Sequence, residues 1–234
     1  YDLFSDKAYL SSDKGRRPLD DEAAIRLWLV IDETYRFRPS WDFYKKVVED
    51  HARTHSFHPV LDYLTGLTWD GTARLDSWLI DYGGAKDTDF VRTVGALTLI
   101  AAVRRVRQPG CLFQEILVLE SGQGMAKSTS LAALCPSEVW FSDDLPLNVG
   151  AKELIERTAG KWIIEASDLS GMKKSEVEHL KSLLSRQVDG PVRMAYGRIP
   201  EERPRSHITI GTTNSNAYLK DMTGNRRFWP VRVG

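Results

Sequence analysis

Hydrophobic and polar positions follow two different patterns along the chain, and the change between them divides the sequence. From Asp20 to Tyr35, apolar residues recur every three or four positions behind an acidic start, which predicts a helix. The same spacing continues in several later segments, so residues 1–88 are expected to form a helical N-terminal module. The further helical segments within residues 1–88 are 41–53 and 75–82, and 90–106 is predicted to be helical just after them.

A different pattern begins after Pro109 and Gly110, where short apolar runs alternate with helical segments. Such alternation predicts an α/β domain, with a mainly parallel sheet flanked by helices, over residues 89–234. The expected strands are 116–119, 139–141, 162–165, 208–213 and 228–233.

Composition narrows the classes of function. The 32 basic residues balance 32 acidic ones, so any contact with DNA must come from a local basic patch. Two cysteines are too few for a disulfide framework, which favours a reducing cytoplasm. The sequence lacks an apolar run of about 18 residues and an N-terminal signal-peptide pattern, so neither membrane insertion nor export is expected.

The segment from Glu115 to Leu134 reads as a strand, a glycine-containing turn and a helix, in that order. Backbone N–H groups of such a turn hold phosphate oxygens, while Lys127 reaches the β- and γ-phosphates and Ser128 ligates magnesium. The sequence therefore predicts a site for ATP and Mg²⁺. Its expected residues are Gly122, Gln123, Gly124, Met125, Ala126, Lys127, Ser128 and Thr129.

This loop departs from the usual G-x-x-x-x-G-K-[S/T] pattern, because Ser121 and Ala126 stand where glycine is usual. If position 126 needs a positive φ, alanine costs on the order of 1 kcal/mol there. If it already lies in the first helical turn, alanine costs almost nothing.

An apolar strand beginning at Lys161 ends in carboxylates, with Glu165 and Asp168 near its end. Nucleotide hydrolases need one carboxylate for magnesium and another to orient the attacking water. Three residues apart on an ideal strand, the two would face opposite sides, so both reach the nucleotide only if the chain turns at Ala166 and Ser167. The division of labour between them stays open.

The next apolar strand runs from His207 and ends in Asn214, whose amide both donates and accepts hydrogen bonds. An asparagine beside an acidic strand would hold the attacking water or the γ-phosphate. About a dozen residues later, Arg226 and Arg227 enter another apolar strand. They are either surface charges or an arginine finger for a neighbouring subunit, and strand alternation lets only one of them reach phosphate.

A predicted hairpin at 192–205 follows a predicted helix at 173–186 and combines arginines with an aromatic residue. Arginine pairs with phosphates and an aromatic ring stacks on bases, so this hairpin is a candidate contact for single-stranded nucleic acid. A solvated β-hairpin is the alternative. The candidate residues are Arg193, Tyr196 and Arg198, with Lys173 and Lys174 as weaker ones.

Taken together, these motifs resemble the virulence-associated protein E (VapE) family, P-loop ATPases of phages and genomic islands that are similar to superfamily 3 helicases. The resemblance covers roughly residues 57–233. Its blocks are Phe57 to Leu64, Leu67 to Gly71, Gln123-Gly124, Lys127-Ser128, Trp162 to Glu165, Tyr196 to Arg198, Gly211 to Asn214 and Thr223 to Pro230.

The resemblance implies an AAA+-like ATPase core behind a helical N-terminal collar. It further implies a ring, hexamer-like in size, that moves on single-stranded or forked DNA during phage-type replication, often beside a primase, in the cytoplasm of a bacterial or phage-infected cell. Arg226 or Arg227 then becomes the trans-acting arginine. An ATP-binding assembly switch or phage-interference protein with little helicase activity is the alternative, and a P-loop kinase is a weaker one.

Overall fold

The structure, a computed structural model, describes residues 1–13, 15–194, 199–214 and 225–234. It contains two compact units, Tyr1–Leu67 and Thr68–Gly234. The sequence pattern predicts a boundary after residue 88. The structure groups residues 68–88 with the second unit, in which the short helix α4 (Trp78–Asp81) packs against α5 (Asp89–Arg107).

The first unit is not purely helical, because it opens with an antiparallel two-stranded hairpin. Its two long helices begin where the sequence predicts. The Asp20 carboxylate accepts a hydrogen bond from the Ala23 N–H and the Ser40 hydroxyl from the Phe43 N–H, so both helix starts are capped. The elements are β1 (Tyr9–Ser12), β2 (Gly15–Pro18), α1 (Asp21–Tyr35), α2 (Trp41–Thr54) and α3 (Pro59–Gly66).

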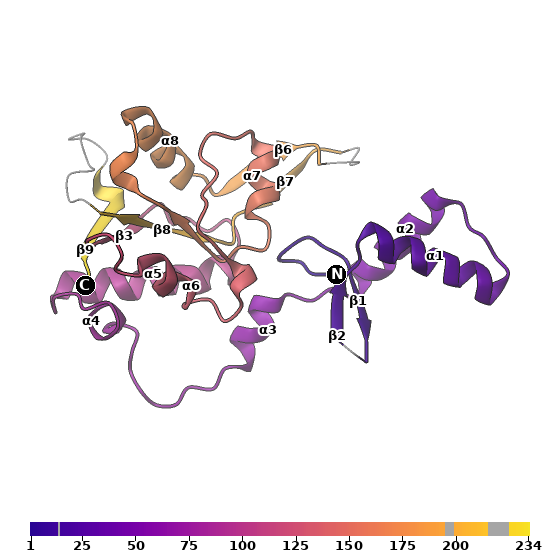
Figure 1. Ribbon diagram of the computed structural model, residues 1–234, viewed down its shortest axis with the longest axis horizontal. Helices are drawn as coiled ribbons and strands as arrows, with labels where there is room; N and C mark the ends of the chain where they lie inside the picture. Colours follow the sequence, from indigo (N-terminus) through magenta and orange to yellow (C-terminus); the bar gives the residue numbers. More distant parts are fainter. Residues whose placement is uncertain (14, 195–198, 215–224) are drawn as a thin grey trace. The chain divides into compact units, whose positions relative to one another are not determined.

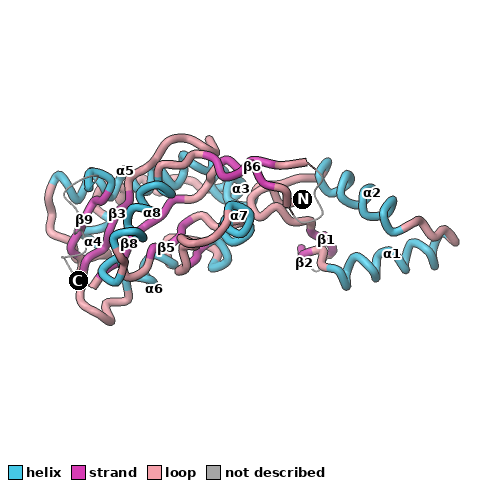
Figure 2. The backbone as a smooth tube through the Cα atoms, turned by 90° about the horizontal axis from the view of Figure 1, so that it is seen from above, coloured by secondary structure: helices cyan, strands magenta, loops and turns pink. Residues whose placement is uncertain are grey.

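The second unit is built on a five-stranded parallel sheet with the order β4-β5-β8-β3-β9. This confirms the mixed α/β class predicted from the alternating pattern. Figure 2 shows β9, β3, β8 and β5 as neighbouring strand segments. Their bounds are β3 (Ile116–Glu120), β4 (Phe141–Ser142), β5 (Ile163–Ala166), β8 (Ile208–Thr213) and β9 (Phe228–Arg232).

Helices cover both faces of the sheet (Figure 1). The helices α7 (Ala151–Thr158) and α8 (Lys174–Leu184) bury Leu154 and Leu180 in one core with alternate strand residues such as Val118 and Ile164. The helices α5 and α6 (Lys127–Ala132) contact the sheet strands as well, α5 at β3 and β8 and α6 at β4 and β5. Strand alternation therefore places Glu165 on the face opposite Ile164.

Two local expectations need correction. The helix expected over 75–82 is shortened to α4, because residues 72–74 form no regular element and 75–77 form a turn. The strand expected over 139–141 contributes only Phe141 and Ser142, since Glu138–Trp140 form a 3-10 turn. A hairpin is present, but it begins earlier than the expected 192–205, because β6 (Val188–Val192) pairs with β7 (Glu201–Pro204).

A buried polar joint ties this hairpin to the rest of the unit. The Arg205 guanidinium donates to both carboxylate oxygens of Asp189, at 2.6 and 2.5 Å, and also to the Leu183 carbonyl in α8. Beside it, Arg105 of α5 donates to the carbonyl oxygens of His207 and Phe113. Burial, followed by the two neighbouring guanidinium groups, holds the pKa of His207 well below its ordinary value, so this histidine is neutral.

None of the helices in the described part of the chain has the length and apolar character needed to cross a membrane.

Candidate phosphate-binding site

A tight loop follows β3 and delivers the chain into α6. Gly124 has φ +82° and Ala126 has φ 50° and ψ 27°, so both residues lie in the left-handed region. Glycine adopts this conformation freely, whereas alanine is strained in it. The first of the two alternatives for position 126 therefore applies, and Ala126 carries backbone strain within the loop.

This strain predicts the direction in which a substitution at position 126 changes the free energy of unfolding. We expect Ala126→Gly to raise the free energy of unfolding by up to about 1 kcal/mol, because glycine removes the left-handed strain. The matched control is Ala96→Gly in the interior of α5, where the same change should cost about 1 kcal/mol. Urea denaturation without nucleotide measures both. A loss of stability in Ala126→Gly equal to that in the control would contradict the strain.

Lys127 begins α6 and folds back over the loop. Its ammonium group donates to Asn214 Oδ1 at 2.9 Å, Ser121 Oγ at 2.9 Å and the carbonyl oxygens of Ser121 and Gly122 at 3.3 and 3.1 Å. Asn214 directly follows β8, the strand adjacent to β3. The structure thus brings together two residues 87 positions apart that the sequence placed in one site.

Glu165 lies on β5 and is 1% exposed. Its Oε1 accepts hydrogen bonds from Ser128 Oγ at 2.9 Å and Thr212 Oγ1 at 2.5 Å. Its Oε2 is buried and has no hydrogen-bond partner among the described residues. A buried carboxylate oxygen without a partner is costly, so this oxygen marks a place for a cation or a hydrogen-bond donor.

Asp168 lies beyond the end of β5, where the chain turns as both carboxylates would require. It has φ 48°, is exposed, and its Oδ1 accepts from Ser170 Oγ at 2.5 Å. No hydrogen bond joins Asp168 to Lys127 or Ser128 among the residues that the structure describes. Glu165 and Asp168 therefore have different surroundings, the first enclosed against α6 and the second open to solvent.

The remaining predicted residues either form no described side-chain hydrogen bond with this cluster or lie outside the described ranges. Arg226 is exposed and Arg227 half-buried in a 3-10 turn before β9, and neither forms an ion pair with a described residue.

Among the candidates for nucleic-acid contact, Arg193 is exposed just after β6. Lys173 precedes α8 and Lys174 begins it. Tyr196 and Arg198 lie outside the described residues. Gln123, Met125 and Thr129 are exposed in the loop and first turn of α6.

Two residues of the site were not predicted from the sequence, Thr212 and Ser121. Thr212 stands two positions before Asn214, so strand alternation puts both on the same side of β8 and could have indicated it. Ser121 was noted only as a departure from the glycine pattern, yet its hydroxyl contacts Lys127. The site is thus a polar cluster at the carboxyl ends of the neighbouring strands β3, β8 and β5, where ligands bind in open parallel sheets.

Fold and site together define a parallel α/β protein with a Lys-Ser loop, a buried carboxylate and an asparagine at one edge of its sheet. In sequence, residues 64–234 match the Virulence-associated protein E-like domain. The chain belongs to this family, which confirms the resemblance drawn from the motifs.

Two solved structures share the fold. They are described as the apo structure of the NrS-1 C terminal region and the A form apo structure of the same region, each 12% identical to this chain, with TM-scores of 0.50 and 0.51. The alignments cover 100% of this chain and 58% of each of those chains. At this identity the likeness concerns the fold alone. No curated protein matches the chain.

Proposed function

We propose that this protein is an ATP-dependent DNA helicase or translocase of phage- or island-type replication. In this proposal the second unit is an AAA+-like P-loop ATPase core. One observation carries the proposal: Lys127 with Asn214, and Ser128 with Thr212 and Glu165, form a polar cluster at the carboxyl ends of three adjacent strands. Membership of the VapE-like family supports the proposal, since the motifs that led to it come from the same resemblance.

Lys127 is suited to hold the phosphates of ATP. Its four acceptors are all uncharged oxygens, which a phosphate would replace with stronger, charge-assisted partners. Asn214, released from Lys127, would then offer its amide to the γ-phosphate or to the attacking water. The loop around Gly122 and Gly124 would supply backbone N–H groups to the remaining phosphate oxygens.

The residues also fit a magnesium ion. Mg²⁺ prefers oxygen ligands, often one or two carboxylates together with phosphates and water. Ser128 Oγ and the unpartnered Oε2 of Glu165 provide such oxygens on adjacent elements. When bound, the ion neutralises charge that develops on the transferred phosphoryl group. Asp168, exposed at the same strand end, is our candidate for orienting the attacking water.

We further propose that the protein works as a ring, hexamer-like in size, in the cytoplasm of a bacterial or phage-infected cell, with a primase as a potential partner. Arg226 is exposed and Arg227 is half-buried, and neither forms an ion pair with a described residue. An arginine without such an ion pair is able to bind the phosphate in a neighbouring subunit's site. The proposed contact for single-stranded or forked DNA is the β6–β7 hairpin. Its candidate residues are Arg193 and, from the sequence, Tyr196 and Arg198. Lys173 and Lys174 are weaker candidates.

The test is ATP turnover at fixed salt, with and without single-stranded DNA, across a series of protein concentrations. Turnover should rise with both DNA and concentration, because each site would need a neighbour's arginine. Mixing Lys127→Ala subunits with subunits carrying Arg226→Ala and Arg227→Ala should restore turnover, since each mutant lacks what the other supplies. Absence of rescue at every ratio would overturn the trans-acting arginine.

A specific observation favours a second candidate, an ATP-binding assembly switch or phage-interference protein that does little work on DNA. Ala126 adopts a left-handed conformation at a position of the phosphate loop where the usual pattern has glycine, and this departure is the reason to consider a switch with little turnover. Tight ATP binding with negligible turnover, insensitive to DNA, would select this candidate.

A further inference from the structure

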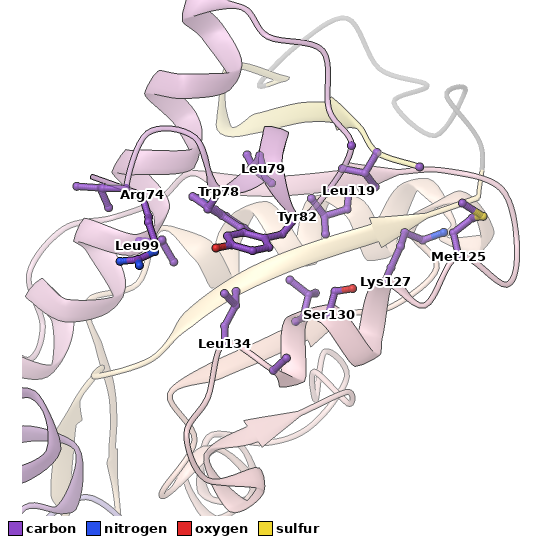
Figure 3. Close-up of a pocket in the computed structure, with 17 residues that line it drawn as sticks. Arg74, Trp78, Leu79, Tyr82, Leu99, Leu119, Met125, Lys127, Ser130 and Leu134 are labelled. Atoms are coloured by element: carbon purple, nitrogen blue, oxygen red, sulfur yellow. The ribbon is translucent and has the colours of Figure 1, made fainter. Parts of the chain in front are cut away.

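An apolar pocket of about 790 Å³ lies directly beside the phosphate-binding loop, within the second unit. Figure 3 shows Trp78 and Tyr82 on one side of it, and Lys127, Ser130 and Leu134 of α6 and the turn that follows on the other. The volume lies within the range of about 300–1,000 Å³ that is typical of small-molecule sites. Most of its lining residues have no role in the proposed phosphate-binding site.

The pocket and the phosphate site are continuous, since Met125 and Lys127 line both. Lys127 stands at one end, whereas Arg74 and Leu99 lie toward the other (Figure 3). A ligand that fits both parts therefore needs an anionic end at Lys127 and a flat, largely apolar end between Tyr82 and Leu134. A nucleoside triphosphate has this division.

We propose that this pocket receives the purine base and ribose of the bound nucleotide, and that it selects the base by shape and stacking. It therefore accepts adenine and guanine alike. This inference rests on the proposed nucleotide site. Tyr82, at the C-terminal end of α4, is 74% exposed and is the ring that a base would cover. Covering exposed aromatic and apolar surface provides the affinity.

Weak discrimination between purines follows from the polar side chains that line the pocket, because Arg74 and Ser130 already have partners and the indole nitrogen of Trp78 is buried. Arg74 donates to both carboxylate oxygens of Asp70, at 3.0 and 2.8 Å, and its pKa is raised by Asp70 first and by Tyr82 to a smaller extent. The Ser130 hydroxyl donates to the Ala126 carbonyl at 3.0 Å. The Trp78 indole nitrogen has no hydrogen-bond partner among the described residues, but it is buried and lies near Gly95 of α5.

Backbone rather than side chains forms one wall of the pocket. Gly234 donates from its N–H to the Gly83 carbonyl at 3.0 Å, and Gly84 has φ +64°. A Cβ atom on Gly84 would lie 2.4 Å from the Gly234 carbonyl oxygen. Glycine at position 84 thus permits this close approach of the backbone at Gly234.

The experiment is isothermal titration calorimetry on the full chain with Mg²⁺, using three probes: the β,γ-imido analogues of ATP and GTP, and inorganic tripolyphosphate. Two variants alter the pocket, Tyr82→Ala by removing the ring and Ala133→Trp by filling space at its wall. The matched control is Tyr35→Ala in the first unit. Tyr35 is 74% exposed, as Tyr82 is.

We expect the ATP and GTP analogues to bind within tenfold of each other and both far more tightly than tripolyphosphate. Tyr82→Ala should weaken both analogues about tenfold, the scale of losing one base–aromatic stack, and leave tripolyphosphate unchanged. Ala133→Trp should act in the same direction, and Tyr35→Ala should change nothing.

Equal binding of tripolyphosphate and the nucleotides, unaffected by both pocket variants, would overturn the base pocket while leaving the phosphate site intact. A preference of more than a hundredfold between the two purines would overturn selection by shape alone. Binding of none of the three probes would overturn the proposed function, and the pocket assignment with it.

Discussion

Replacing Lys127 with alanine should reduce ATP turnover at least a hundredfold, on the scale of losing one preorganised cationic or hydrogen-bonding group at a reacting phosphate. The structure gives the reason, since this ammonium group meets loop oxygens and Asn214 at the carboxyl ends of β3 and β8. Steady-state phosphate release with saturating single-stranded DNA measures the effect.

The matched control is Lys152→Ala on α7, a surface lysine whose ammonium group lies 3.8 Å from Glu156. This substitution also removes one positive charge, but outside the proposed site, so turnover should stay within about twofold. Exposed ion pairs contribute little to stability, so the variant should still fold. Circular dichroism checks that both variants fold. Undiminished turnover in Lys127→Ala would remove the basis for the phosphate-binding site.

The second large effect concerns stability, and we expect Arg205→Ala to lower the free energy of unfolding by about 3–5 kcal/mol. Both side chains of the Arg205–Asp189 pair are 3% exposed, so the substitution leaves the Asp189 carboxylate buried without its bidentate partner. It also removes the donor to the Leu183 carbonyl. Urea denaturation followed by circular dichroism gives the change.

A matched arginine lies two positions away on β7. Arg203 is partly exposed and its guanidinium lies 3.9 Å from Glu201, so Arg203→Ala should cost under about 1 kcal/mol. The double variant Arg205→Met with Asp189→Leu should recover much of the loss, since it removes the unpaired charge as well. Equal costs for Arg205→Ala and Arg203→Ala would show that the buried pair contributes no special stability.

Local patterns were sufficient for most of the elements. The strands at 208–213 and 228–232 and the helix α5 agree with the apolar spacing, and α1 begins at the acidic cap that the sequence offers. The failures fall where tertiary contacts outweigh local preference. The helix α7 was not expected, because it spans only eight residues, although Leu154 packs with strand residues in the core and Ile155 is buried.

The order of the strands could not be read from the chain. Strand β3 pairs with β8 and β9, while β4 and β5 lie beyond β8, although β4 follows β3 in sequence. Strands that are buried on both faces have similar hydrophobic sequences. Which strands pair depends on the crossover helices that connect them and pack on the faces of the sheet. This order alone puts Asn214 beside Lys127 and Thr212 beside Glu165.

By itself, the sequence determined the class of fold, the family and the chemical types of the site: a lysine and a serine after a buried strand, a carboxylate and an asparagine after two others. These follow from residue type and short-range spacing, which the chain carries directly. The tertiary structure alone decided that Glu165 rather than Asp168 meets Ser128, that Ala126 is strained, and that an apolar pocket adjoins Lys127. Each of these depends on residues distant in sequence or on backbone angles fixed by their packing, and no local pattern encodes them.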